Sequence, residues 1–437
     1  MGRTRTSPQL LRRTNMTVVL EVMRSAGVVT VSDLIEATGL VRTTVIAVCD
    51  DLVRAGWIQE VEAVSGAHAG RPARRFRFDD RAGCVVGVDV GEAKTTAVVA
   101  DLRGRVLGQV TREFADPSPA PRLTTVDDVV DQVLAHARVA PSAVLAAAVG
   151  VAAPVDRRGR VRRGRPSWEA LDIGLGSRIG ERHGWPVALA NDANLAAMAE
   201  RWCGAATGVD DLVVMLAGER IGAGVIESGR LLHGRSGGAG ELGSMALVEG
   251  VGTQDGVAAL CRSWAADAVR PGAPATMLRD LADPSGVVAS ESVFRAAAAG
   301  DDVARRILDR LADRLARITG LVGTMFDPEL VVIAGAVAEP AAVLLDRIAG
   351  LLPRYTVTPP RVAVSTLGEG VVSVGAVRLA LDHVERHALD LELGDTARSS
   401  RTTPSAATDQ GPASPVAGDV VSRRADGADS TAWPASP

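Results

Sequence analysis

Apolar residues recur at intervals of three and four along the first part of the chain, which is the spacing of amphipathic helices. The pattern predicts helices over residues 14–26, 30–38 and 41–55, and glycines follow each of them. The second and third helices are separated by a short turn that contains Gly39. Two helices joined by such a turn indicate a helix-turn-helix arrangement.

Two strand patterns follow these helices, over residues 57–61 and 74–78, and they flank a basic, glycine-containing loop at 65–72. Strands around a loop of this kind are typical of the wing that accompanies a helix-turn-helix. We therefore predict that residues 10–80 form a winged helix-turn-helix domain.

The next stretch alternates between apolar runs and amphipathic segments, which indicates an α/β domain. Apolar runs predict strands at 84–91, 95–101, 106–111 and 143–151, and a helix is expected at 125–137. A second, similar cycle opens with the apolar run 212–216. The repeated strand-loop-strand unit suggests two related lobes around a cleft, which we place at residues 84–203 and 204–390.

The end of the second lobe follows the same alternation. We predict helices at 301–319, 341–352 and 374–389 and strands at 330–337 and 361–365. The last helix could return to the first lobe. From residue 393 to 437 the sequence is rich in Ser, Thr, Pro, Ala and Asp without periodicity, which predicts a disordered tail.

Charge changes the interpretation of the N-terminal domain. The whole chain carries a net charge of −4, whereas residues 1–78 contain eleven Arg and seven acidic residues, a local +4. A nucleic-acid contact would therefore have to come from this local region. The alternative is a winged helix that makes protein contacts only.

Candidate DNA-binding residues lie at the start of the third helix and on the wing. The start of a recognition helix presents side chains to base edges, and wing arginines can neutralise phosphates. The candidates are Arg42, Thr43, Thr44, Gly70, Arg71 and Arg74.

The four cysteines are scattered without C-x-C or C-x-x-C spacing. This argues against a disulfide framework and against a thiolate zinc site. The chain shows no signal-peptide h-region and no apolar run of membrane-spanning length, so we expect a cytoplasmic protein.

One short segment unites a strand end and a helix start. The apolar residues 188–190 lead into Asn191-Asp192, and an alanine-rich helical pattern follows. Asn and Asp are strong helix N-cap residues, and open α/β sheets bind ligands at the carboxyl ends of their strands. Taken alone, the segment could be a capped helix and nothing more.

With these motifs in order, residues 10–390 resemble the ROK family of repressors, open reading frames and sugar kinases, and in particular its winged-helix branch. The resemblance implies an actin-like ATPase fold, with two ribonuclease-H-like lobes that close on sugar and ATP. The phosphate-loop motif D-x-G-G-T-K falls on Asp89 to Lys94, and the N-D-A-N motif is intact at Asn191 to Asn194. The sugar motif G-x-x-G-E-I-G-H falls on Gly237 to Ser244.

The resemblance implies roles for single residues. Asp192 corresponds to the general base of the kinases, Asn191 to a residue that holds a neighbouring sugar hydroxyl, and Glu241 and Ser244 fall on the sugar motif. The phosphate and magnesium site, if retained, would use Asp89, Gly91 and Lys94.

The sequence departs from the family pattern on the nucleotide side. Glu92 replaces a glycine in the first phosphate loop, and Glu219-Arg220 replaces Thr-Gly in the second. A phosphate cradle needs converging backbone N–H groups without side chains in the way. A carboxylate at each loop would repel ATP phosphates unless it were neutralised, so we do not expect ATP and magnesium as cofactors. The adenosine-side glycines are weakened to Ala334-Gly335-Ala336.

The zinc motif of the family is absent. Residues 251–256 occupy its place without a cysteine, and Ser244 replaces a histidine that contacts sugar and helps to bind zinc. Structural zinc needs four ligands, so we expect no zinc.

Three hypotheses follow. The first is a DNA-binding transcription regulator of carbohydrate-related genes, expected to be a repressor and no enzyme, whose body binds a sugar or sugar derivative and forms a dimer or dimer of dimers. Asp192 would then recognise a sugar hydroxyl without reacting. The alternative is an active glucokinase-like enzyme with an accessory DNA-binding domain, and the third is a regulator whose body is a scaffold without a ligand.

Overall fold

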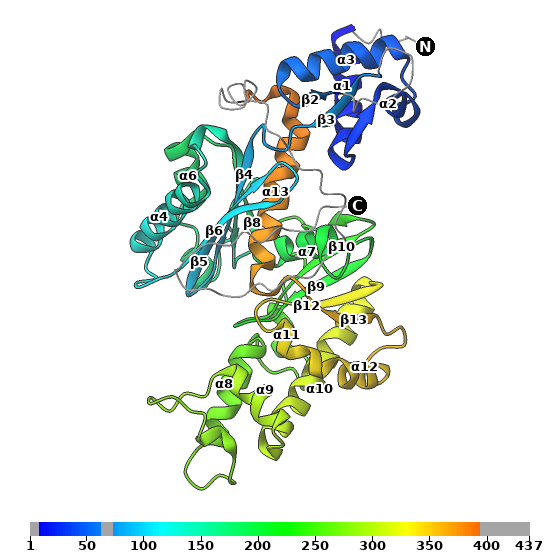
Figure 1. The fold of residues 1–437 in the computed structure, drawn as a ribbon. Coiled ribbons are helices and arrows are strands. Elements are labelled where there is room, and N and C mark those ends of the chain that lie inside the picture. Colours follow the sequence, from blue (N-terminus) through cyan, green and yellow to red (C-terminus); the bar gives the residue numbers. More distant parts are fainter. Residues whose placement is uncertain (1–7, 63–72, 394–437) are drawn as a thin grey trace.

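The N-terminal unit combines three helices with a small sheet (Figure 1). The computed structural model describes residues 8–62 and 73–393. The helices are α1 (Pro8–Ser25), α2 (Val31–Thr38) and α3 (Arg42–Ala55). The strands β1 (Val28–Thr30), β2 (Ile58–Val61) and β3 (Arg75–Phe78) form an antiparallel sheet in the order β1-β3-β2.

Local sequence signals fix the short helix α2. The Thr30 hydroxyl accepts the backbone N–H of Asp33 at 3.2 Å, and the Asp33 carboxylate accepts the N–H of Thr30 at 2.8 Å. This reciprocal pair is a capping box. Gly39 ends the helix with φ 68°, a left-handed conformation that suits glycine. The turn to α3 is therefore short.

The first lobe is built on a mixed sheet with the order β6-β5-β4-β7-β8. The hairpin strands β5 and β6 are antiparallel to their neighbours, whereas β7 and β8 continue the sheet in parallel. The strands are β4 (Cys84–Val90), β5 (Lys94–Asp101), β6 (Val106–Glu113), β7 (Val144–Val151) and β8 (Val187–Asn191). The helices are α4 (Pro119–Ala137), α5 (Pro166–Glu169) and α6 (Leu175–His183), with a 3-10 turn at Pro141–Ala143.

The second lobe repeats this topology, because its sheet has the order β11-β10-β9-β12-β13 with the same strand directions. This confirms the doubled unit that the sequence predicted. Its strands are β9 (Leu212–Leu216), β10 (Gly222–Glu227), β11 (Arg230–Leu231), β12 (Leu330–Ala334) and β13 (Arg361–Val364). Its helices are α8 (Val257–Ala268), α9 (Ser290–Ala298), α10 (Asp302–Phe326), α11 (Ala338–Ala341) and α12 (Leu345–Leu351). Short 3-10 turns lie at Gly243–Leu247, Met277–Arg279, Ala342–Leu344, Leu352–Arg354, Gly368–Gly370 and Ala388–Asp390.

Some element bounds differ from the sequence prediction. Helix α4 begins at Pro119 rather than near residue 125, because proline is tolerated in the first turn of a helix. Helix α10 continues past residue 319 to Phe326, so Gly320 does not end it. Gly320 instead packs directly against Tyr355, where an added Cβ would lie 2.7 Å from the Tyr355 Cβ. The predicted helix 341–352 is divided into α11, α12 and 3-10 turns.

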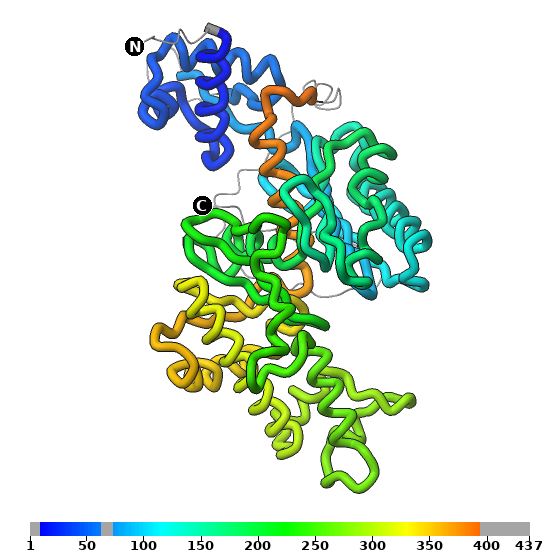
Figure 2. Tube along the Cα trace, turned by 180° about the vertical axis from the view of Figure 1, so that it is seen from behind, coloured from blue at the N-terminus to red at the C-terminus, as the bar shows by residue number. Residues whose placement is uncertain are grey.

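Two helices occupy the centre of the molecule. They are α7 (Asp192–Cys203), which follows β8, and α13 (Val371–His387), which packs on β4 and β7 of the first lobe. The two helices approach closely at Gly375, where a Cβ would lie 1.9 Å from the carbonyl oxygen of Leu195. From this centre α13 extends to the N-terminal unit, as both views show (Figures 1 and 2).

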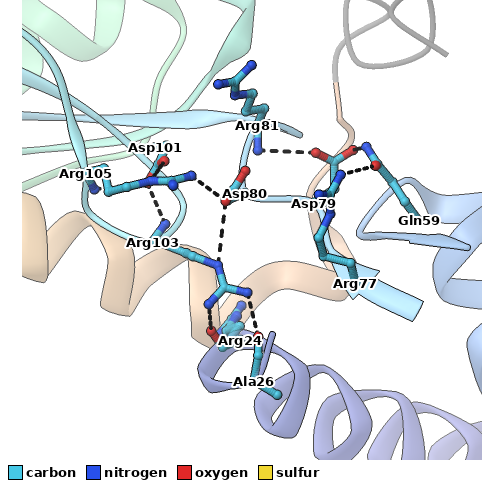
Figure 3. A network of polar contacts seen from close by, with 10 residues as sticks. All are labelled: Arg24, Ala26, Gln59, Arg77, Asp79, Asp80, Arg81, Asp101, Arg103 and Arg105. Carbon is cyan, nitrogen blue, oxygen red and sulfur yellow. Dashed lines mark hydrogen bonds and ion pairs between the residues drawn. The ribbon is translucent and has the colours of Figure 1, made fainter. Parts of the chain in front are cut away.

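A network of arginines and aspartates joins the N-terminal unit to the first lobe (Figure 3). Arg103, in the β5–β6 turn, donates to the carbonyl oxygens of Arg24 at 2.8 Å and Ala26 at 2.7 Å. Arg24 lies in the last turn of α1 and Ala26 directly follows the helix, where carbonyl groups have no helical partner. Asp80 forms ion pairs with Arg103 and Arg105, at 3.7 and 2.5 Å.

Apolar packing continues across this junction. Met23, Leu34, Trp57 and Phe76 of the N-terminal unit are buried in the same hydrophobic cluster as Leu381 of α13. The N-terminal unit is thus packed on the body through a shared core. Within residues 8–62 and 73–393, no helix is both long and apolar enough to span a bilayer.

Candidate functional site

The Asn191-Asp192 segment lies where β8 passes into α7, as the sequence predicted. Asn191 is the N-cap residue, and its side-chain oxygen accepts the backbone N–H of Asn194 at 3.0 Å. Its amide group donates to the Ala153 carbonyl at 3.2 Å and to the Asp192 carboxylate at 3.0 Å. These bonds fix the orientation of both side chains at the carboxyl end of the sheet.

Two aspartates, Asp89 and Asp192, lie close enough at this point for the charge of Asp192 to act on Asp89. Desolvation by the surrounding protein and the charge of Asp192 together raise the pKa of Asp89 to about 7, while Lys94 opposes the shift. Desolvation also raises the pKa of Asp192 to about 6, against the backbone N–H of Ala193. Two such carboxyls can accept hydroxyl groups or a proton near neutral pH.

Glu241 belongs to the same site. Glycines Gly237 and Gly240, both with positive φ, carry its loop tightly past Val155 and Ala223, where a Cβ would lie 2.1 and 2.0 Å from carbonyl oxygens. Glu241 is exposed, yet nearby protein desolvates its carboxyl enough to raise its pKa, and Arg165, Arg162 and Arg220 oppose this. The charges of Glu241 and Arg220 also act on Asp192. We call Asp89, Asn191, Asp192, Arg220 and Glu241 the central site.

The segment that resembles the first phosphate loop of the family is a tight turn closed by the Gly91 N–H, which donates to the Lys94 carbonyl at 3.0 Å. Arg122 of α4 donates to the carbonyl oxygens of Gly91 and Glu92, at 3.0 and 3.3 Å, and so holds the loop on the lobe. The Lys94 ammonium, predicted for the phosphate site, forms an ion pair of 2.5 Å with Glu369 just before α13.

The segment that resembles the second phosphate loop carries a carboxylate that is paired with an arginine. Glu219 forms a two-fold ion pair with Arg262 of α8, one contact measuring 2.9 Å. The repulsion that we expected from Glu219 is therefore reduced by this partner. The carbonyls of the loop also accept N–H groups from the start of α8, since Val257 and Ala258 donate to Ala217 and Gly218.

Arg314 holds residues 251–256, the segment that stands where the family has its zinc motif. Arg314 of α10 is buried and donates to the carbonyl oxygens of Val251 at 2.8 Å and Thr253 at 2.7 Å. In the described part of the chain, no three His, Cys, Asp or Glu side chains gather in a way that could hold a metal ion. Ser244 is exposed in the 3-10 turn Gly243–Leu247.

The candidate nucleic-acid contacts are distributed over the N-terminal unit. Arg42 and Thr43 are exposed at the start of α3, and Thr44 is half-buried. Arg74 forms ion pairs with Asp50 at 2.8 Å and Glu60 at 2.7 Å, so a phosphate would compete with these two carboxylates for it. Gly70 and Arg71 lie outside the described residues.

Three arginines near Glu241 were not among the predicted site residues. They are Arg162, Arg165 and Arg220, and the first two come from a loop between β7 and α5. Residues 157–165 contain six arginines and no acidic residue, a charge run that could have drawn attention to this loop. In the sequence Arg220 stood out only as a departure from the phosphate-loop motif, whereas in the structure its charge acts on Asp192.

Comparison with known proteins finds a matching family model, and both sugar kinases and transcriptional repressors are similar to this chain. The family model described as "ROK family" matches residues 85–383. A glucokinase from Thermotoga maritima is 27% identical over 323 residues, which cover 69% of this chain and 98% of the glucokinase. The DNA-binding transcriptional repressor Mlc from Escherichia coli is 21% identical over 369 residues, covering 79% of this chain and 88% of the repressor.

Among solved structures, a ROK family transcriptional regulator described as a homologue of the E. coli Mlc protein superposes with a TM-score of 0.72. It is 21% identical and covers 88% of this chain and 99% of its own length. At this identity the likeness establishes the fold.

Proposed function

This chain belongs to the ROK family, and from that membership we propose that it is a DNA-binding transcriptional repressor whose kinase-derived body binds a carbohydrate effector. The observation that carries the proposal is the N-terminal unit, in which an exposed helix start at Arg42 and Thr43 follows a short turn after α2. We interpret this unit as a winged helix-turn-helix, with α3 as the recognition helix and β2 and β3 as the strands of the wing.

The lengths of the matches support this interpretation. The T. maritima glucokinase matches over nearly its whole length yet covers 69% of this chain, whereas the regulator structure covers 88%. The additional length corresponds to what a DNA-binding domain ahead of the kinase-like body requires. We propose the division into a DNA-binding domain at residues 10–80 and two lobes at 84–203 and 204–390.

The central site supplies the effector pocket in this proposal. Asn191, Asp192 and Glu241 would accept and donate hydrogen bonds to sugar hydroxyls, and Ser244 would lie at the edge of the site. Binding would change the closure of the two lobes and thereby the placement of the winged helix. A homodimer would read the two halves of a palindromic operator.

Selection of bound duplexes from a random-sequence pool, at physiological salt, tests the DNA-binding part. We expect the full chain to enrich a two-fold symmetric sequence, and the double variant Arg42→Ala/Thr43→Ala to lose that enrichment. Arg54→Ala is the matched control, because Arg54 is exposed at the opposite end of the same helix and pairs with Asp51. Equal retention by the wild type and by the α3 double variant would contradict the proposal.

A sugar kinase remains the second candidate, and three observations favour it. Asp89 and Asp192 are both present, the pKa of Asp192 is near 6, and Arg262 neutralises Glu219 in the second phosphate loop. A carboxylate with this pKa can take a proton from a sugar hydroxyl. Purified protein with ATP, magnesium and a panel of hexoses decides between the candidates: turnover that disappears in Asp192→Ala would establish the kinase.

A further inference from the structure

A short arginine-rich hairpin lies beside the central site. Residues 155–162 form this hairpin, with a β-bridge between Val155 and Val161 and a turn closed by the Gly159 N–H, which donates to the Asp156 carbonyl at 2.9 Å. The six arginines of residues 157–165 lie on and just after it. We call residues 155–165 the arginine hairpin.

Two of these arginines are satisfied locally by carboxylates. Arg160 binds Asp156 through two nitrogens, at 2.9 and 2.7 Å, and Arg163 approaches Asp172 at 3.4 Å. By contrast, in the described part of the chain no ion pair within 4 Å joins Arg162 or Arg165 to a carboxylate. The positive charges of Arg162 and Arg165 are therefore not balanced by an ion pair.

One aromatic ring holds Arg162 and Arg165 together. Their guanidinium carbons lie 5.8 and 4.9 Å from the centroid of the Trp168 ring in α5. Each cation is attracted by the ring, but the two cations repel one another. An anion that binds between them would remove this repulsion, and planar guanidinium groups suit phosphate and carboxylate oxygens.

The same two arginines reach across to the loop that carries Glu241. A Cβ on Gly238 would lie 2.8 Å from Arg162 Nη1, and a Cβ on Gly243 would lie 2.7 Å from Arg165 Nη2. Arg165 also donates to the Gln254 side chain at 3.0 Å. Together with Arg220, three guanidinium groups act on the single carboxylate of Glu241. The first lobe thus presents excess positive charge to the second.

There is room for a ligand group at this place. A cavity of about 390 Å³ lies along the arginine hairpin, and its lining residues are Asp156, Arg160, Val161, Arg162, Arg163, Asp172 and Ser236. Its two carboxylates pair with Arg160 and Arg163, so among the described residues Arg162 is the lining arginine without an ion pair, and Arg165 and Glu241 lie outside the lining. The carboxylates of Asp89 and Asp192 lie at the ends of β4 and β8, and the guanidinium groups of Arg162 and Arg165 act on Glu241, whose charge in turn acts on Asp192. A ligand with hydroxyls at one end and a negative charge at the other matches this arrangement.

We propose that the effector is an anionic carbohydrate, whose hydroxyls bind Asp192 and Glu241 and whose phosphate or carboxylate binds Arg162 and Arg165. This rests on the proposed function, because it names the chemical class of the effector for the same site. The anionic group would link the first lobe to the loop of the second. Charge recognition would therefore coincide with closure of the lobes.

Isothermal titration of the full chain with carbohydrates that differ in charge tests the proposal. The panel pairs glucose with glucose 6-phosphate and glucuronate, galactose with galacturonate, and N-acetylglucosamine with its 6-phosphate, and it includes inorganic phosphate alone. We expect a phosphate or a carboxylate form to bind at least about tenfold tighter than its neutral partner, which corresponds to about 1.4 kcal/mol. The phosphate and uronate arms identify which anionic group the site prefers.

Variants locate the effect. Arg162→Gln/Arg165→Gln should weaken binding of the anionic form by about tenfold or more and leave neutral sugar within about twofold. Arg157→Gln/Arg158→Gln removes the same charge from the same hairpin at residues that neither line the cavity nor act on Glu241, and it should leave the affinity within about twofold. Circular dichroism and the melting temperature of each variant verify folding.

Several results would overturn the inference. Equal affinity for neutral and charged partners, or equal losses in the two double variants, would remove the anion site while leaving the carbohydrate repressor intact. Loss of DNA retention in Arg162→Gln/Arg165→Gln without any sugar would make the hairpin a nucleic-acid contact instead. Failure of the whole panel to bind, with operator selection intact, would reject the carbohydrate effector as well.

Discussion

Asp89 and Asp192 are two carboxyl groups that the fold holds in one poorly solvated place. Desolvation and the charge of Asp192 raise the pKa of Asp89 to about 7, and desolvation and the charge of Glu241 raise that of Asp192 to about 6. Because the two groups interact, their protons leave in coupled steps. At neutral pH the pair therefore carries less than its full negative charge.

This arrangement predicts a pH-dependent effect of Asp89→Asn on stability. A carboxyl whose pKa is raised by folding stabilises the native state below its unfolded pKa, and that contribution is lost as the pH rises through the folded pKa. The wild type is therefore penalised more at pH 8, above the folded pKa, than at pH 5, which lies between the unfolded and folded values. We expect Asp89→Asn to raise the free energy of unfolding, measured by urea denaturation, by on the order of 2 kcal/mol more at pH 8 than at pH 5.

Asp283→Asn serves as the control for this measurement. Hydrogen bonds from Ser285 and Val287 lower the pKa of Asp283, so this group is ionised at both pH values. Its substitution should change stability by the same amount at pH 5 and pH 8. An Asp89→Asn effect that is equally independent of pH would contradict the raised pKa.

The sequence could predict those site residues whose placement depends on local signals. Asn191 and Asp192 were found because an apolar run, two capping residues and a helical pattern follow one another directly. Arg162 and Arg165 were not found, because their partners are distant in sequence: Arg165 contacts Gln254, 89 residues further on. Likewise, the pairing of Glu219 with Arg262 spans 43 residues and depends on where α8 begins.

At the scale of elements, the strands of both lobes were predictable because buried apolar runs bounded by turns specify them. Helices α8 and α9 were not, because the residues before them, Gly256 and Ala289, make no side-chain cap. The start of α8 is capped instead by the carbonyls of Ala217 and Gly218. Such a cap exists in the folded protein only, so the sequence carries no local signal for it.

Arg314 shows how one side chain organises a segment without regular structure. Its guanidinium is buried, which lowers its pKa, and its donors reach the carbonyls of Val251 and Thr253. These bonds fix the chain between the sugar-motif loop and α8. A buried backbone carbonyl that loses its donor is costly.

We expect Arg314→Met to lower the free energy of unfolding by about 1–3 kcal/mol, because the Val251 carbonyl loses its partner. Arg306→Met makes the same change at an exposed position on α10 and should have little effect. Urea denaturation measures both variants.

Addition of EDTA should leave the melting temperature of the wild type unchanged. A fall on chelation would show that a metal ion holds this protein together.

For the whole molecule, the central site and the N-terminal unit are joined by two packed helices. Helix α7 begins at Asp192 and brings Trp202 to Arg378 of α13, whose guanidinium lies 5.3 Å from the ring centroid. Arg378 forms an ion pair of 2.6 Å with Glu385, and Glu385 lies 3.9 Å from Arg24 at the end of α1. A shift of α7 on effector binding would therefore reach the N-terminal unit through α13.

Contact alone does not establish such coupling, which is a free energy between two binding events. By reciprocity, an effector that weakens operator binding must itself bind more weakly when operator is present, by the same factor. For a coupling of about 1–3 kcal/mol, the factor is roughly 5 to 150. Titrating the effector with and without operator measures this factor, and titrating the operator with and without effector must give the same value.

Arg103 is the residue at which this coupling is most directly testable, because it ties the β5–β6 turn to the carbonyls of Arg24 and Ala26 at the end of α1 and just after it (Figure 3). We expect Arg103→Met to leave operator and effector affinities, each measured alone, within about threefold of wild type, but to reduce the coupling factor between them by at least about fivefold. Arg81→Met is the matched control, since the Arg81 contact drawn in this network is made by its backbone N–H. A coupling factor that Arg103→Met leaves intact would place the transmission elsewhere, and the shared apolar core between α1 and α13 would then be the element to vary.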